Sequence, residues 1–227
     1  MSTCFLREVC NGKDCQSDFC LRKYKMDSLY SAALMTDSQK KHIILRVDED
    51  GTDLEQFKQL AAIEQNIMSF VSEGKNLYLH SANCGNGKSS WSLRLTEAFF
   101  NKIWARTEVK CRALFISVPR FLLALKDNIS SKNSYVEYIK ENVLDADLVI
   151  WDDIAAKMGS EFELTHLLNI IDNRLALGKS NIYTSNLNRQ QLYIALGERL
   201  TSRIANMSID IELFGSDKRN LIVEAND

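Results

Sequence analysis

From residue 76 onward, short runs of hydrophobic residues alternate with longer segments in which hydrophobic residues recur every three or four positions. The short runs predict β-strands over residues 76–81, 111–118, 148–153, 181–185 and about 209–214. The longer segments predict amphipathic helices over residues 90–106, 120–129, 134–143 and 161–177. Alternation of this kind predicts a three-layer α/β fold, in which helices cover both faces of a parallel sheet. Ligands bind such sheets at the carboxyl ends of the strands, so the residues that follow each strand are the candidates for chemistry.

A further helix is predicted between residues 54 and 74. Hydrophobic residues follow near-helical spacing from Leu54 to Val71, Asp53 stands at the N-cap position, and Gly74 is typical of a helix end. The preceding residues, 48–53, have the polar, turn-prone sequence Asp-Glu-Asp-Gly-Thr-Asp. We therefore expect a boundary here, with an N-terminal module at residues 1–50 and the α/β domain at residues 51–227.

The N-terminal segment is rich in cysteine. Cys4, Cys10, Cys15 and Cys20 lie within the first twenty residues, which do not have the pattern of a secretory signal peptide. In a reducing compartment, clustered thiols are more typical of metal ligands than of disulfides. The spacing lacks the paired C-x2-C units of common zinc sites, so three interpretations remain open: a Zn²⁺ site, an iron–sulfur cluster, or reduced thiols without a metal. We take Zn²⁺ as the working prediction.

Composition narrows the class of protein. The 227 residues are 45% hydrophobic and 26% charged, values typical of a globular chain with a sizeable core. The net charge of −2 requires any nucleic-acid contact to come from a local basic patch. No hydrophobic run approaches the roughly 18 residues that cross a bilayer. These features predict a soluble, cytoplasmic protein without a membrane partner.

The first predicted strand is followed by a glycine-containing loop. Residues 82–89 match the phosphate-binding pattern G-x4-G-K-[ST], except that alanine replaces the first glycine. The expected cofactor-binding residues are Ala82, Asn83, Cys84, Gly85, Asn86, Gly87, Lys88, Ser89 and Ser90. Gly85 and Gly87 allow backbone N–H groups to turn toward phosphate oxygens, and the following helix presents its positive N-terminus. Lys88 is placed to reach the β- and γ-phosphates, and the Ser89 hydroxyl to bind Mg²⁺.

Two later strands also end in polar residues. The run Leu-Val-Ile-Trp at 148–151 is followed by Asp152, a candidate Mg²⁺ ligand, and by Asp153, a candidate base that orients and deprotonates the attacking water. After the next strand, Asn186 or Thr184 is a candidate to hydrogen-bond the γ-phosphate or the water. A helix N-cap role for Asn186 or Asn188 is the alternative.

Arg199 and Arg203 lie four residues apart and therefore share one helix face. A guanidinium that reaches the γ-phosphate of a neighbouring subunit accelerates hydrolysis by orders of magnitude. The alternative is that both arginines pair with surface carboxylates of their own chain.

Taken together, the motifs resemble those of AAA+ ATPases of the DnaC/DnaI helicase-loader group, which is close to the IstB-type transposition ATPases. The resemblance runs over about residues 54–223 and rests on residues 82–89, 148–154, 182–187 and 197–204, with a similar ending at 215–219. It implies a five-stranded parallel sheet in the order 5-1-4-3-2 without a full lid domain.

The resemblance also implies roles for single residues. Lys88 and Ser89 correspond to Walker A, Asp152 and Asp153 to Walker B, and Asn186 to sensor 1. Arg199 corresponds to the arginine finger, with Arg203 as the alternative, and Arg219 is a substitute for the missing lid residue. An aspartate at 153, where many AAA+ ATPases have glutamate, favours slow hydrolysis, which suits a switch.

The function implied is an ATP- and Mg²⁺-dependent loader that binds a replicative hexameric helicase of the DnaB type and single-stranded DNA, as a homo-oligomer or assembled on the helicase ring. Residues 1–50 would then dock the partner. Arg120, Lys126 and Lys132, near Phe121, form the candidate single-strand contact, although a solvated helix face explains them equally well. Two other functions remain open: a transposition helper that binds duplex DNA and a transposase, and an adaptor that binds ATP without hydrolysing it.

Overall fold

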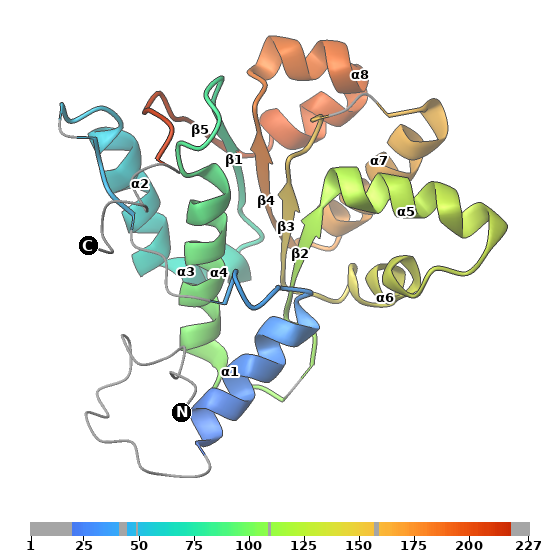
Figure 1. Ribbon diagram of the computed structural model, residues 1–227, viewed down its shortest axis with the longest axis horizontal. Helices are drawn as coiled ribbons and strands as arrows, with labels where there is room; N and C mark the ends of the chain where they lie inside the picture. Colours follow the sequence, from blue (N-terminus) through green and yellow to red (C-terminus); the bar gives the residue numbers. More distant parts are fainter. Residues whose placement is uncertain (1–19, 41–44, 49, 109, 157–158, 219–227) are drawn as a thin grey trace, which may run out of the picture.

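The chain folds around one five-stranded parallel sheet with helices on both faces (Figure 1). The computed structural model describes residues 20–40, 45–48, 50–108, 110–156 and 159–218. The strands are β1 (Asn76–His80), β2 (Ala113–Ser117), β3 (Leu148–Asp152), β4 (Ser180–Ser185) and β5 (Ile209–Glu212). Their order across the sheet, β2-β3-β4-β1-β5, confirms the predicted order 5-1-4-3-2.

Alternate residues of each strand face opposite helical layers, which explains two separate hydrophobic cores. Leu77 and Leu79 of β1 pack in the core beneath α2 (Leu54–Gln65), α3 (Ile67–Ser72) and α4 (Lys88–Ile103). Tyr78, between them, packs in the other core. The helices of that second layer are α5 (Val118–Ser130), α6 (Ser134–Asn142), α7 (Glu161–Ala176) and α8 (Arg189–Ala205). The three predicted layers are confirmed.

The helix predicted over residues 54–74 differs in two respects. It divides at Asn66 into α2 and α3. Asp53 does occupy the N-cap position of α2, but its side chain makes no capping bond and its φ is 68°. The carboxylate instead accepts hydrogen bonds from the backbone N–H groups of Phe214 (2.7 Å) and Gly215 (2.8 Å). The expected cap is therefore replaced by a long-range contact.

Helix α1 (Leu21–Ala32) was not predicted from the sequence. Its buried residues Met26, Leu29 and Tyr30 belong to the same core as Phe100 of α4, and Tyr30 and Phe100 meet edge to face with ring centroids 5.2 Å apart. This part of the N-terminal segment therefore shares the core of the sheet. The division into units at residues 1–50 and 51–227 stays a prediction.

None of the helices in the described ranges is both long enough and apolar enough to cross a bilayer.

Candidate nucleotide-binding site

The glycine-containing loop lies where the sequence predicts, between β1 and α4. Gly85 and Gly87 have φ angles of 74° and 107°, in the left-handed region that glycine adopts without a steric penalty. Helix α4 begins at Lys88, directly after the loop. The loop backbone and the helix N-terminus together provide the partial positive charge that binds phosphate groups.

A cavity of about 210 Å³ lies against this loop. It is lined by residues from three segments of the chain: Gly85, Asn86, Gly87, Lys88, Ser89, Ser90, Asp153 and Asn186. The fold thus brings the loop together with the residue after β3 and the residue after β4. These are the carboxyl ends of neighbouring strands, as expected for a ligand site in a parallel sheet.

Lys88 is buried, and its ammonium group points back into the loop. Its Nζ donates to the backbone oxygen of Asn83 at 2.8 Å and to Asn86 Oδ1 at 3.3 Å. The lysine is therefore held within the loop that lines the cavity, where its charge favours an anionic ligand.

Asp152 lies beside Ser89 at the end of β3. The Ser89 hydroxyl donates to Asp152 Oδ1 at 2.8 Å, and the Thr184 hydroxyl donates to the same oxygen at 2.7 Å. Burial raises the pKa of Asp152, and the two hydroxyl hydrogen bonds oppose that rise. A carboxylate beside a hydroxyl is the kind of oxygen donor set that Mg²⁺ prefers, so these residues fit the ion that the fold implies.

Asp153 has a positive φ of 56°, which is uncommon for a residue with a side chain. The conformation is held by β4, because Asp153 N donates to Thr184 Oγ1 at 3.0 Å and Ile154 N donates to the Thr184 carbonyl at 2.8 Å. Strained backbone held in this way is characteristic of functional sites. The result is that Asp152 turns toward Ser89 while Asp153 lines the cavity.

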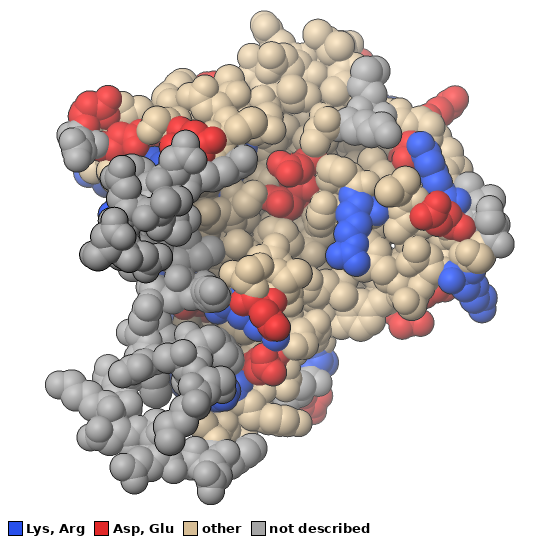
Figure 2. All heavy atoms as spheres, in the orientation of Figure 1, with Lys and Arg blue, Asp and Glu red and all other residues tan. Residues whose placement is uncertain are grey.

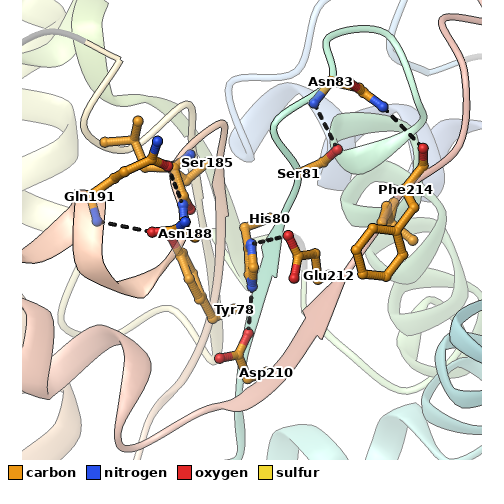
Figure 3. A network of polar contacts seen from close by, with 12 residues as sticks. Tyr78, His80, Ser81, Asn83, Ser185, Asn188, Gln191, Asp210, Glu212 and Phe214 are labelled. Carbon is orange, nitrogen blue, oxygen red and sulfur yellow. Dashed lines mark hydrogen bonds and ion pairs between the residues drawn. The ribbon is translucent and has the colours of Figure 1, made fainter.

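Thr184 and Asn186, the two candidates at the end of β4, have different surroundings. Thr184 is buried and binds Asp152 and Asp153 through its hydroxyl, whereas Asn186 lines the cavity. Asn188, and not Asn186, caps α8: its Oδ1 accepts from Gln191 N at 3.0 Å, and Gln191 Oε1 accepts from Asn188 N at 2.9 Å (Figure 3). The sequence did not predict the positioning role of Thr184. The signal that could have indicated it is a hydroxyl side chain near the end of a strand that neighbours β3.

The two arginines of α8 have different environments. Arg203 forms an ion pair with Asp172 of α7. Arg199 is exposed, and within the described ranges it has neither a hydrogen bond nor an ion pair. Both follow Gly197, where the helix is interrupted by a φ of 77°. Neither is among the residues that line the cavity of its own chain.

The first part of the loop is exposed and does not line the cavity. Ala82, Asn83 and Cys84 are exposed, and the Asn83 amide bridges to the segment after β5 by donating to the carbonyl of Phe214 at 3.0 Å (Figure 3). These three positions of the predicted binding loop are therefore not part of the cavity lining.

Most of the predicted metal ligands at the N-terminus lie outside the described residues. Only Cys20 of the four is described, and its sulfur accepts a hydrogen bond from Lys23 N at 3.4 Å as the N-cap of α1. Within the described ranges, no cluster of three or more His, Cys, Asp or Glu side chains could hold a metal ion. Arg219 also lies outside these ranges.

The candidate DNA-binding residues are partly paired. Arg120 lies over the ring of Tyr135 at 4.4 Å, and Lys126 Nζ is 3.3 Å from Glu163 Oε1, while Lys132 is exposed. On the face drawn in Figure 2, acidic and basic side chains of the described residues are scattered and form no broad basic patch.

The strand order and the loop between β1 and α4 define a P-loop domain of AAA+ architecture. No family model matches the chain. The replicative helicase loader DnaC of Escherichia coli K12 is 26% identical over 139 residues, which cover 61% of this chain and 51% of that protein. DnaC of Buchnera aphidicola is also 26% identical, over 141 residues that cover 62% and 51%. The chain thus spans about half the length of the curated relatives it matches.

Solved structures share the fold. A DnaC helicase loader superposes with a TM-score of 0.59 at 20% identity, covering 82% of this chain and 98% of that one. DnaI gives 0.57 at 23% identity, covering 74% and 92%. The replication initiator DnaA bound to AMPPCP and single-stranded DNA gives 0.55 at 19% identity, covering 73% and 47%. The chain is thus similar in sequence to DnaC helicase loaders and in fold to DnaC, DnaI and DnaA, in agreement with the resemblance that its motifs carry.

Proposed function

We propose that this protein is an ATP-dependent loader of a replicative helicase. The observation that carries the proposal is the convergence of Lys88, Asp153 and Asn186 on one polar cavity, beside a hydrogen-bonded Ser89–Asp152 pair. This is the arrangement that nucleoside triphosphate hydrolysis requires: a cradle for the phosphates, a metal-binding carboxylate and a group to orient water.

The roles of the residues follow from their positions. Backbone N–H groups of residues 85–89 and the Lys88 ammonium group bind the phosphate oxygens. Ser89 and Asp152 would hold Mg²⁺, which when bound offsets phosphate charge. Asp153 orients the attacking water and accepts its proton, and Asn186 hydrogen-bonds the water or the γ-phosphate. The short side chain of Asp153 makes turnover slow, which suits a switch between loading and release.

The exposure of Arg199 supports hydrolysis of ATP at a contact between two subunits. A guanidinium that has no partner among the described residues of its own chain is available to a neighbouring copy, whereas Arg203 is occupied by Asp172. The protein would then act as a homo-oligomer, either free or assembled on the helicase ring, and ATP hydrolysis would depend on that assembly.

The partners in this proposal are a hexameric helicase of the DnaB type and single-stranded DNA. The curated relatives are named replicative helicase loaders, and their similarity to this chain supports the first partner. Residues 1–50 would provide the docking module, with Zn²⁺ or an iron–sulfur cluster as its possible metal. Residues 119–132 would contact the DNA. A cytoplasmic location completes the proposal.

Calorimetry with Mg·ATP tests the nucleotide site. We expect wild type to bind, Lys88→Ala to lose measurable binding because the ammonium charge is removed, and Asp153→Asn to bind normally but release no phosphate. Asp145→Ala, an exposed carboxylate outside the cavity, is the matched control and should behave as wild type. Full phosphate release by Asp153→Asn would assign the base to another residue, and equal binding by Lys88→Ala would refute the site.

Pull-down assays with a purified hexameric replicative helicase and with a transposase test the partner. We expect capture of the helicase in the presence of ATP and a loss of capture by a chain that lacks residues 1–19. Capture of the transposase alone would replace the loader by a transposition helper. ATP-dependent capture without any phosphate release would identify an adaptor.

A further inference from the structure

Residues 213–218, which we call the C-terminal strap, leave β5 and cross the phosphate loop. The strap begins at the sheet, where Leu213 N donates to the His80 carbonyl at 2.8 Å. It lies against the phosphate loop, where the Asn83 amide donates to the Phe214 carbonyl (Figure 3).

Three residues of the loop bind the strap. The Asn83 amide donates to the carbonyls of Phe214 (3.0 Å) and Gly215 (3.2 Å). The buried Asn86 amide donates to the Leu213 carbonyl at 3.3 Å while its own oxygen accepts from Lys88. The Gly85 carbonyl accepts from Lys218 N at 3.0 Å.

The contact at Gly85 is also close-packed. A Cβ added to Gly85 would overlap the Asp217 carboxyl group, so a larger residue here would force that side chain to move. Gly85 also has a positive φ and lines the cavity, so the strap contacts the loop at a position that belongs to the site.

Two aspartates before α2 hold the other side of the strap. Asp53, only 4% exposed, accepts from Phe214 N at 2.7 Å and from Gly215 N at 2.8 Å. Asp48 accepts from Ser216 N at 3.1 Å and lies 3.4 Å from Lys218 Nζ. Hydrogen bonds to ionised groups are stronger than those between neutral groups, so these carboxylates fix the strap firmly.

We propose that Asp48 and Asp53 are positioning residues for nucleotide binding, which act through the strap on the phosphate loop. The proposal rests on the proposed nucleotide site. A loop with two left-handed glycines loses much conformational entropy when it is ordered, and a strap that holds it before binding removes that cost from the binding step. Because linkage is reciprocal, bound nucleotide also stabilises the contacts of the strap with Asp48 and Asp53.

The test combines hydrogen exchange on the free protein with Mg·ATP calorimetry. Asp53→Ala should speed exchange at residues 82–88 and weaken Mg·ATP affinity roughly 3- to 30-fold, the range typical of residues coupled indirectly to a site. The matched control is Asp147→Ala, which removes a carboxylate that pairs with Arg112 and, at 3.2 Å, with Lys179. Asp147 directly precedes β3, at the opposite end of the parallel strands from the phosphate loop. Asp147→Ala should change neither the loop exchange nor the Mg·ATP affinity. A general loss of stability would change both measurements in both variants.

A second variant covers the case in which Asp53→Ala fails to fold. Gly215→Ala adds one methyl group, whose carbon would lie 2.6 Å from Asp48 Oδ2 and 2.8 Å from Asp53 Oδ2. The two carboxylates and the strap must then move apart, although no carboxylate is removed. It should reproduce the faster exchange and the weaker binding. If wild type binds Mg·ATP and these variants match it in affinity and in loop exchange, the inference is overturned while the proposed function stands. If wild type binds no nucleotide, the proposed function itself is overturned.

Discussion

At the scale of single residues, the site depends on how its carboxyl groups are surrounded. Asp152 accepts two hydroxyl hydrogen bonds on one oxygen, and burial raises its pKa. Asp153, the next residue, is turned by its positive φ so that it lines the cavity instead. Adjacent aspartates thus face different environments, and in the proposed mechanism one strand end supplies both the metal ligand and the base.

The raised pKa of Asp152 predicts a pH dependence of Mg·ATP binding. Binding of Mg²⁺ requires the ionised carboxylate, so a proton competes with the ion and is released when it binds. Affinity should therefore fall as the pH is lowered, beginning at a higher pH than for an exposed aspartate. Calorimetry in buffers of different ionisation enthalpy measures the proton released.

Asp152→Asn should bind Mg·ATP weakly and without proton release. Asp145→Asn, at an exposed position, is the control and should keep the wild-type profile. Wild-type affinity that stays constant through the acid range would contradict this assignment.

At the scale of elements, the buried Arg174 of α7 joins segments that are distant in the sequence. Its guanidinium donates to the carbonyl of Ala146 at 2.9 Å, to the carbonyl of Ser180 at 2.6 Å and to Asn181 Oδ1 at 2.7 Å. Burial lowers its pKa to about 10, so the group stays cationic at neutral pH. It thereby fixes the starts of β3 and β4, whose far ends carry Asp152 and Asn186.

Replacing this arginine should destabilise the whole fold. Arg174→Met leaves several buried carbonyl and amide oxygens without donors, at a cost of about 1–3 kcal/mol for each group left unpaired. Denaturant unfolding measures the free energy of unfolding. The control Lys140→Met removes an exposed cation paired with Glu137 on α6, and should change that free energy by less than about 0.5 kcal/mol. Equal unfolding midpoints for the two variants would refute the structural role of Arg174.

At the scale of the whole molecule, the proposed hydrolysis of ATP requires a second copy of the chain to contribute an arginine to the cavity. Arg199 is exposed on α8 beyond the interruption at Gly197 and is not among the residues that line its own cavity. The phosphate loop and Arg199 of one chain would then serve two different active sites. An assembly built in this way hydrolyses ATP only when neighbouring chains meet.

This arrangement predicts complementation between inactive variants. Arg199→Ala should bind Mg·ATP but release no phosphate, and Lys88→Ala should be inactive because it binds no nucleotide. A mixture should regain phosphate release, since each Lys88→Ala chain still offers Arg199 to the intact site of its neighbour. A mixture that stays inactive would place Arg199 in its own chain's site, and the pair Arg203→Ala plus Lys88→Ala would then test the alternative arginine.

Local patterns were sufficient for the fold and for the residues of the cavity. The alternation of strands and helices predicts the parallel sheet, and the loop at 85–90 with the strand ends at Asp153 and Asn186 predicts the cavity lining. Helix α1 also had a local signal, because Met26, Leu29, Tyr30 and Ala33 follow helical spacing. The exposed Leu21 and Tyr24 interrupt this pattern, so the signal is weak.

The class of fold and the residues around the phosphate loop could be predicted from the sequence, because both depend on burial and backbone conformation within short segments. Long-range contacts in the folded chain explain why Asp53 holds the strap instead of capping α2, why Thr184 positions two aspartates, and why Arg203 pairs with Asp172 while Arg199 stays exposed. Each of these outcomes depends on which distant partner comes within hydrogen-bonding distance, and the spacing of residues along the chain carries no information about that distance.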